Sequence, residues 1–183
     1  MRHAIHFQEW WIRHRAALPA HAFVLRGVDD AQPAPGVLAS LQWADVVLLP
    51  PSNPVVSIGT ILQVPGVRAA LRATQAPVVG VSPIIGGAPV RGMADACLTA
   101  IGVETTAGAV AAHYAARRTR VPEGGDGGGL LDGWLVDTSD ADATAPLEAL
   151  GITARAVPLW MKDESTATAL AAAALALAQE LRR

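Results

Sequence analysis

The order of apolar and polar positions predicts that helices and strands alternate along most of the chain. Short apolar runs bounded by proline, glycine or acidic residues are typical of strands, and longer segments with one apolar side are typical of helices. The predicted strands are residues 22–26, 46–49, 77–81, 133–136 and 153–157. The predicted helices are residues 7–17, 37–43, 67–73, 93–101, 106–116, 145–150 and 163–182. This alternation favours an α/β, Rossmann-like fold with a mainly parallel sheet flanked by helices.

Two of the predicted strands end in loops that are rich in proline and small polar residues. The run 46–49 continues into Pro50-Pro51-Ser52-Asn53-Pro54, and the run 77–81 continues into Ser82-Pro83-Ile84-Ile85-Gly86-Gly87. Proline stiffens the exit from a strand, whereas serine and asparagine supply short donors and acceptors. If the two strands are neighbours, both loops lie at the carboxyl edge of the sheet, where open α/β sheets bind ligands. The alternative is that these residues only cap and shape turns.

Composition narrows the classes of protein and partner. The chain has 183 residues, of which 51% are hydrophobic and 16% charged, so we expect a single α/β domain over residues 1–183. A net charge of −2 gives no electrostatic reason to bind nucleic acid. The opening residues lack the apolar core of a signal peptide, and the Ala/Leu run at 167–178 is too short to span a bilayer. We therefore expect no membrane role.

Cys97 is the single cysteine of the sequence, and its apolar surroundings predict a small hydrophobic residue in the core. A single cysteine that cannot form an intrachain disulfide fits a reducing cytoplasm.

The segment at residues 122–129 is dominated by glycine and predicts a flexible loop. It lacks the features of a phosphate-binding loop, because no predicted strand precedes it and no lysine follows it. Asp126, inside the segment, would also repel a phosphate. We interpret the segment as a linker or a floppy hairpin.

Candidate metal ligands and acid–base groups are sparse. The clustered acids are Asp132, Asp137, Asp140 and Asp142, which surround the predicted strand 133–136. Successive side chains of a strand point to opposite faces, so we expect these acids to be solvated surface residues rather than metal ligands. His113 beside Tyr114 is a candidate acid–base pair, although a structural role is the favoured interpretation. No residue is assigned as catalytic or metal-binding.

Four segments together resemble the 2-phospho-L-lactate transferase or phosphoenolpyruvate transferase family of coenzyme F420 biosynthesis. They occur in that family's order and at similar spacing, and the likeness runs from residue 6 to the last predicted helix. The segments are His6-Phe7-Gln8-Glu9-Trp10-Trp11, Pro51-Ser52-Asn53-Pro54-Val55-Val56-Ser57-Ile58-Gly59, Val81-Ser82-Pro83-Ile84-Ile85-Gly86-Gly87 and Leu131-Asp132-Gly133-Trp134-Leu135-Val136-Asp137. The resemblance implies transfer of a 2-phospho-L-lactyl or phosphoenolpyruvyl group from a guanosine diphosphate-linked donor to the terminal hydroxyl of the deazaflavin FO. It also implies release of GMP and use of magnesium.

The resemblance, read with the chemistry of the loops, assigns candidate site residues. On the guanosine-nucleotide side we expect Ser52, Asn53 and Ser57. On the neighbouring wall, for the other substrate, we expect Ser82, Pro83, Ile84 and Gly86, with Ile84 as an apolar face for a flat ring and Arg91 to balance phosphate charge. The alternatives are a plain turn at Ser82-Pro83 and a surface cation at Arg91.

The sequence also departs from the family pattern. The family's Gly-rich nucleotide loop and acidic metal residues lie in an amino-terminal half for which this sequence has no counterpart, so we expect a carboxy-terminal portion or a shortened member. Pro50 stands where the family usually has glycine. Activity is then expected to need the missing half, and a homodimer is a further expectation. The alternatives are a non-catalytic nucleotide-binding or regulatory module, and an inactive fragment whose exposed sheet edge mediates association.

Overall fold

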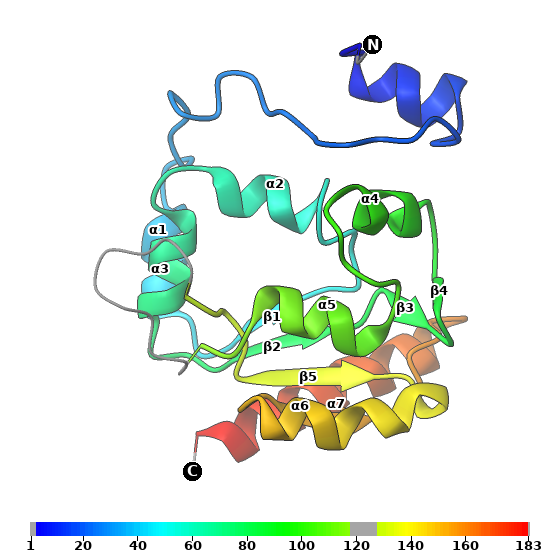
Figure 1. Cartoon of the computed structure of the whole chain (residues 1–183). Helices are drawn as coiled ribbons and strands as arrows, with labels where there is room; N and C mark the ends of the chain where they lie inside the picture. Colours follow the sequence, from blue (N-terminus) through cyan, green and yellow to red (C-terminus); the bar gives the residue numbers. More distant parts are fainter. Residues whose placement is uncertain (1–2, 118–127, 183) are drawn as a thin grey trace.

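The structure is a computed structural model that describes residues 3–117 and 128–182. Its centre is a sheet of parallel strands in the order β1-β2-β5-β6 (Figure 1). The strands are β1 (Val47–Leu49), β2 (Val78–Val81), β5 (Gly133–Val136) and β6 (Thr153–Ala156). A separate antiparallel pair consists of β3 (Ile84–Ile85) and β4 (Ala88–Pro89). The α/β, Rossmann-like prediction is confirmed.

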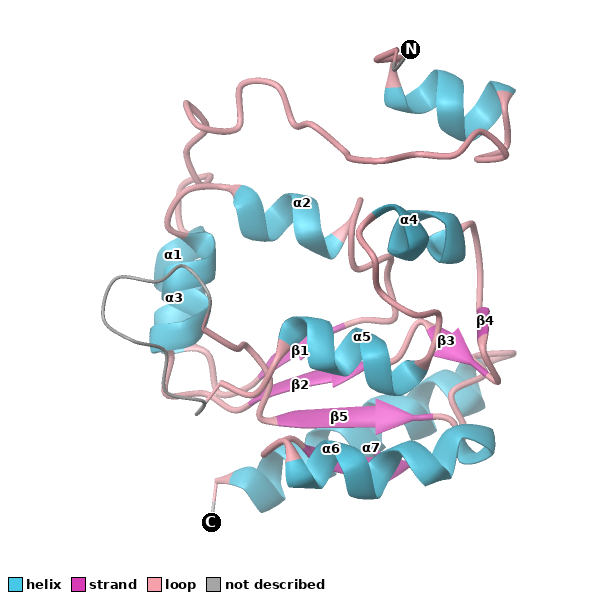
Figure 2. Cartoon of the chain, in the orientation of Figure 1, coloured by secondary structure: helices cyan, strands magenta, loops and turns pink. Residues whose placement is uncertain are grey.

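Helices cover both faces of the sheet (Figure 2). The α-helices are α1 (Val37–Trp43), α2 (Ile58–Gln63), α3 (Val67–Ala73), α4 (Ala94–Ala100), α5 (Ala107–Tyr114), α6 (Thr144–Ala149) and α7 (Glu164–Leu181). A π-helix spans Glu9–Arg13 and a 3-10 helix spans Thr138–Ala143. Successive side chains of each strand point to opposite faces of the sheet, so the core has two parts. Val78 and Trp134 pack on the face covered by α5, whereas Val79 and Leu135 pack against α7 on the other face.

The amino-terminal segment differs most from the sequence predictions. The predicted helix at residues 7–17 is helical only over residues 7–13, of which Glu9–Arg13 form the π-helix. It ends there because the chain turns back with positive φ at Arg15 and Ala16, and the Trp10 indole nitrogen donates a hydrogen bond to the Leu18 carbonyl at 2.7 Å. The predicted strand at residues 22–26 is wrong, since this segment is irregular. It crosses the surface without a neighbouring strand, leaving Val24 exposed while Phe23 packs on Trp10.

A small hydrophobic cluster joins this segment to the rest of the molecule. Trp10 and Cys97 are buried in it, and Val55 and Val56 pack against them. Figure 1 shows the amino-terminal segment lying over α2 and α4. Cys97 is a free, buried cysteine, as predicted. The cluster therefore links the amino-terminal segment to the loop that follows β1.

Two further features bear on the sequence predictions. Most of the predicted flexible loop at residues 122–129 lies outside the described residues; Gly128 and Gly129, which are described, are buried. Within residues 3–117 and 128–182, every helix falls short of the length or the apolar character that a membrane span requires.

Candidate functional site

The loops after β1 and β2 leave the same edge of the sheet, as the sequence predicts. β1 and β2 pair in parallel, with Leu49 opposite Gly80 at their carboxyl ends. Residues 50–57 and 82–92 therefore start side by side. This is the edge where open α/β sheets bind ligands.

Asn53 shapes the first loop from within. Its side-chain oxygen accepts hydrogen bonds from the amides of Val55 at 2.9 Å and Val56 at 3.1 Å, and its carbonyl accepts from Ser57 and Ile58. The side-chain nitrogen is buried and aligned with no acceptor among the described residues. It is still close enough to Cys97 to influence that thiol, whose pKa is raised by burial and only partly lowered by the Asn53 amide. The oxygen of Asn53 is thus committed to the loop, as the capping alternative expects.

A glycine allows the same loop to close tightly. A Cβ at Gly59 would lie 2.6 Å from the Pro54 carbonyl oxygen, so the first turn of α2 and the loop approach more closely than any other residue type permits. The consequence is a rigid loop with a fixed path from β1 into α2.

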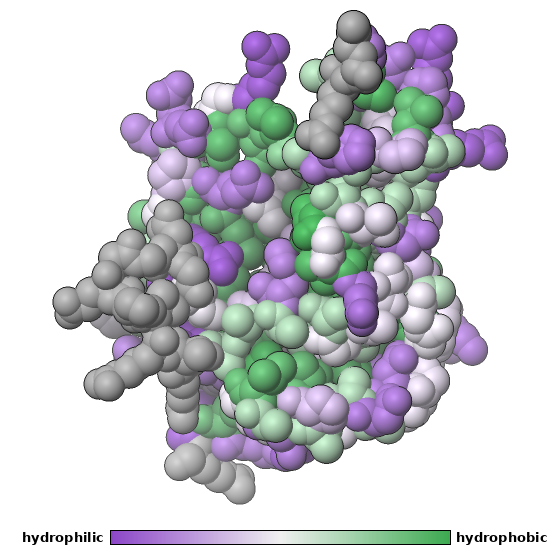
Figure 3. Space-filling model, viewed as in Figure 1, coloured by the Kyte–Doolittle hydropathy of each residue, from purple (hydrophilic) through white to green (hydrophobic). Residues whose placement is uncertain are grey.

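Ser52 and Ser57 keep their hydroxyl groups available. Within the described part of the chain neither hydroxyl forms a hydrogen bond, and both line a hollow of about 590 Å³ between β1, α1, α2 and α3. The remaining wall is mainly apolar and includes Leu48 and Ile61. Figure 3 shows hydrophobic and hydrophilic residues side by side over this part of the molecule. Two hydroxyls at the margin of an apolar hollow can orient a ligand that carries both a flat ring and polar oxygens.

The first residues of the second loop form a buried turn. Ser82 is fully buried, and its hydroxyl donates to the Ile84 carbonyl at 2.8 Å and accepts from the Ile84 amide at 3.1 Å. Pro83 and Ile84 are also buried. These residues form the plain turn that was the alternative interpretation, and in this conformation none of them reaches the surface. Their contact with a ligand stays a prediction.

Of the predicted site residues in the second loop, Gly86 and Arg91 are exposed. The Gly86 amide is not available, because it donates to both carboxylate oxygens of Asp140 at 3.1 and 3.0 Å. Gly86 and Gly87 have φ of 57° and 76°, so they form the tight turn between β3 and β4 that the sequence analysis missed. The Gly-Gly pair after two isoleucines was the signal that could have revealed it.

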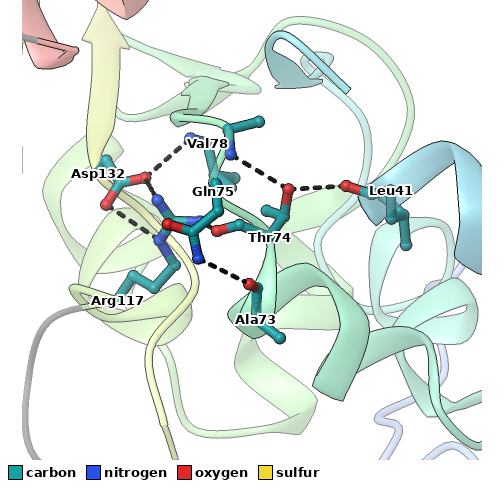
Figure 4. Close-up of polar contacts among 8 residues, drawn as sticks. Leu41, Ala73, Thr74, Gln75, Val78, Arg117 and Asp132 are labelled. Atoms are coloured by element: carbon teal, nitrogen blue, oxygen red, sulfur yellow. Dashed lines mark hydrogen bonds and ion pairs between the residues drawn. The ribbon is translucent and has the colours of Figure 1, made fainter. Parts of the chain in front are cut away.

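The four acids do not form a cluster. Asp132 lies at the amino end of β5 and is buried; it accepts hydrogen bonds from the Val78 amide at 2.8 Å and from Nε of Arg117 at 3.1 Å (Figure 4). Arg117 also donates to the Thr74 carbonyl at 2.8 Å. This network joins segments that are far apart in the sequence. It lies at the amino ends of the parallel strands, opposite the carboxyl ends from which the candidate loops leave.

Asp137 lies at the carboxyl end of β5 and is also buried. Burial alone would raise its pKa, but hydrogen bonds from the Leu159 amide at 2.9 Å and from the amide and hydroxyl of Ser139 outweigh burial and lower it. The prediction of solvated surface acids is therefore wrong for Asp132 and Asp137. Both carboxylates are buried because they satisfy backbone amides that would otherwise lack partners.

The described residues do not fit a magnesium site. Among residues 3–117 and 128–182 no group of three or more histidine, cysteine, aspartate or glutamate side chains is arranged to hold a metal ion. Asp132 and Asp137 are occupied as described above, and Asp140 is occupied by Gly86. Mg²⁺ requires oxygen ligands that are free to turn toward it, and these carboxylates are not free.

His113 and Tyr114 support the structural interpretation. Tyr114 is buried against Trp134, with ring centroids 5.9 Å apart, and burial raises its pKa far above the ordinary value. The pKa of His113 is lowered by burial and by the positive charge of Arg68. A tyrosine that resists ionisation inside the core is unsuited to proton transfer near neutral pH.

A second hollow, of about 500 Å³, lies between α5, the 3-10 helix and α6. Its polar lining includes Glu104, Asp140 and Asp142. These carboxylates would repel an anionic ligand, so of the two hollows the one beside Ser52 and Ser57 is electrostatically the better suited to an anion.

Comparison with known proteins shows the family of this chain. Residues 2–160 match the family model described as 2-phospho-L-lactate transferase CofD. The chain is 57% identical over 181 residues to a phosphoenolpyruvate transferase of Streptomyces coelicolor and 58% identical over 181 residues to that of Thermobifida fusca. These alignments cover 99% of this chain but 53% and 51% of the two relatives. The chain spans about half the length of the curated relatives that it matches.

Proposed function

Because this chain belongs to the 2-phospho-L-lactate transferase CofD family, we propose that it supplies the nucleotide-facing wall of a transferase in coenzyme F420 biosynthesis. The observation that carries the proposal is the family match over residues 2–160. The loop with Ser52 and Ser57 supports it, because this loop lies at the carboxyl edge of the sheet and lines a hollow. The names of the relatives favour a phosphoenolpyruvyl group as the group transferred, with 2-phospho-L-lactyl as the alternative.

The proposed reaction is an attack on a diphosphate. The terminal hydroxyl oxygen of FO forms a bond to the phosphorus that carries the phosphoenolpyruvyl group, and the bond from that phosphorus to the bridging oxygen breaks. GMP leaves with the bridging oxygen, and the hydroxyl proton passes to solvent. Catalysis of such a transfer consists mainly of positioning and charge stabilisation.

On this chain the residues proposed to take part act by binding and orientation. The free hydroxyls of Ser52 and Ser57 are placed to donate to polar oxygens of the guanosine nucleotide at the margin of the hollow. Asn53 is a positioning residue, since it holds the loop amides of Val55 and Val56. Gly86 and Arg91, which are exposed on the neighbouring loop, are proposed to contact the second substrate. No step is assigned to magnesium here, because the carboxylates of the described residues do not fit it.

A second candidate function is nucleotide binding without turnover. The observation that favours it is the commitment of Asp132, Asp137 and Asp140 to internal hydrogen bonds. Among the described residues no group of three or more acids is then arranged to hold a metal ion. The two functions differ in one outcome: a binding module retains guanosine diphosphate but releases no GMP from the donor when FO is supplied.

The double substitution Ser52→Ala/Ser57→Ala is expected to weaken binding of guanosine diphosphate to this chain. Two lost hydrogen bonds to polar oxygens cost about 1–3 kcal/mol, or roughly 5-fold to 150-fold in affinity. Isothermal titration calorimetry measures the change. Ser165→Ala is the matched control, because Ser165 is exposed in the first turn of α7 and lies outside the hollow. Equal affinity of the wild type and the double variant would contradict the proposed binding role.

A further inference from the structure

The hairpin of β3 and β4 carries Gly86 at its tip and leads directly to Arg91, the two residues proposed to contact the second substrate. Its strands have two residues each and form a sheet that is separate from the central one. A two-stranded hairpin of this size has little stability of its own. Contacts with the rest of the chain therefore decide where Gly86 and Arg91 lie.

The base of the hairpin is fixed inside the protein. Ile84 is fully buried, and the Ser82 hydroxyl closes the turn that leads into β3. On the return side, the Val90 amide donates a hydrogen bond to the Pro83 carbonyl at 2.9 Å, and Arg91 follows directly. The tip, by contrast, is exposed at Gly86 and Gly87, so the buried base alone does not fix it.

Asp140 anchors the tip from another loop. Both of its carboxylate oxygens accept a hydrogen bond from the Gly86 amide, at 3.1 and 3.0 Å. The two residues are 54 positions apart in the sequence, and both loops leave the carboxyl edge of the central sheet. Hydrogen bonds to an ionised acceptor are stronger than those between neutral groups. The contact is therefore suited to holding a small exposed turn.

The segment that carries Asp140 is itself held in place. The Asp140 amide donates to the Asp137 carbonyl at 2.9 Å, and the buried Asp137 carboxylate accepts from the Leu159 amide at 2.9 Å. Leu159 belongs to the core cluster against which Ile85 of β3 also packs. Figure 1 shows β3 and β4 beyond the arrowhead of β5, where this segment begins. Asp137 and Asp140 thus connect the loops that follow β2, β5 and β6.

We propose that Asp140 is a positioning residue for the second substrate, because it fixes the hairpin tip so that Gly86 and Arg91 present one defined surface to FO. The inference rests on the proposed function, which supplies the identity of that substrate. Asp140 acts through the Gly86 amide and not by touching FO. The Arg91 side chain forms no hydrogen bond or ion pair with the described residues, so its charge is available to a ligand.

Binding of FO by three single variants tests this role. Asp140→Ala is expected to weaken FO binding about tenfold in isothermal titration calorimetry, because the tip loses its anchor. Asp140→Asn keeps a side-chain oxygen that can accept from the Gly86 amide, so its affinity should stay within about threefold of the wild type. Asp142→Ala is the matched control, since Asp142 lies on the same 3-10 helix and is exposed. Its side chain forms no hydrogen bond with the described residues.

Two further measurements separate positioning from a general loss of structure. In hydrogen exchange, the Gly86 amide is expected to exchange about tenfold faster or more in Asp140→Ala, and Asp140→Asn should restore much of the protection. The affinity for guanosine diphosphate should be equal in all four proteins, because Ser52 and Ser57 lie on the loop after β1. A structural role alone would lower both affinities together.

Unchanged FO affinity or unchanged Gly86 exchange in Asp140→Ala would overturn the positioning role and leave the proposed function standing. Equal weakening by Asp142→Ala, or a parallel loss of guanosine diphosphate affinity, would overturn it too. A wild-type chain that binds guanosine diphosphate but not FO would have the same consequence. A chain that binds neither at millimolar concentration would overturn the proposed function itself and the positioning role with it.

Discussion

Replacing Asp132 with asparagine is expected to lower the free energy of unfolding by about 3–5 kcal/mol, because it removes one partner of a buried ion pair. Asp132 and Arg117 have side chains that are 6% and 14% exposed. An asparagine amide would present hydrogens to the guanidinium, and the positive charge would stay buried without compensation. The loss of stability is not confined to the ion pair, because Arg117 also donates a hydrogen bond to the Thr74 carbonyl at the carboxyl end of α3 (Figure 4). Urea denaturation at neutral pH measures the loss.

The control for Asp132 is an acid in an exposed ion pair. Glu148 pairs with Arg155 at 3.1 Å, and both side chains are about half exposed. Glu148→Gln is therefore expected to change stability by less than about 1 kcal/mol. Equal free energies of unfolding for Asp132→Asn and Glu148→Gln would contradict the claim that the buried Asp132 network stabilises the amino ends of the strands.

Gly80→Ala is expected to destabilise the protein by about 1–3 kcal/mol, as overpacking of a filled core usually does. Gly80 lies in β2 opposite Trp134, and a Cβ there would approach the indole ring to 2.4 Å. The ring is fully enclosed and cannot move aside without disturbing the core on the α5 face. The melting temperature and urea midpoint measure this effect.

Gly108→Ala is the matched control, and it is expected to raise the stability that Gly80→Ala lowers. A Cβ at Gly108 in α5 would meet its nearest neighbour, the Cβ of Ala143, at an ordinary 3.7 Å. Replacing a helical glycine with alanine under these conditions should stabilise by about 0.5–1 kcal/mol. A destabilising Gly108→Ala or a neutral Gly80→Ala would contradict this account of the packing.

Much of the fold could be predicted because its signals are local. The helices at residues 37–43 and 67–73 and the strand at 133–136 were predicted with the bounds that the structure shows. The strand predicted at 22–26 failed because an apolar run does not reveal whether a partner strand exists. Partners are distant in sequence, and pairing is decided by the tertiary structure.

For the candidate site, the sequence predicts which polar groups are present but not which hydrogen bonds they form. The sequence predicted that polar residues follow β1, and the structure places Ser52 and Ser57 on a hollow at that point. It could not show that the Ser82 hydroxyl is used within its own turn, or that Asp132 pairs with Arg117 across 15 positions. Residue type indicates which hydrogen bonds are available, whereas only the fold decides which of them are already used.

The central claim is that the loop after β1 contacts the guanosine nucleotide, and chemical-shift mapping tests it most directly. Guanosine diphosphate is titrated into the isotopically labelled chain, and amide shifts are followed by two-dimensional nuclear magnetic resonance. Our account predicts the largest shifts at Ser52, Asn53 and Ser57 and along the hollow beside them. Shifts confined to the hollow between α5 and α6, or no shifts at millimolar nucleotide, would contradict it.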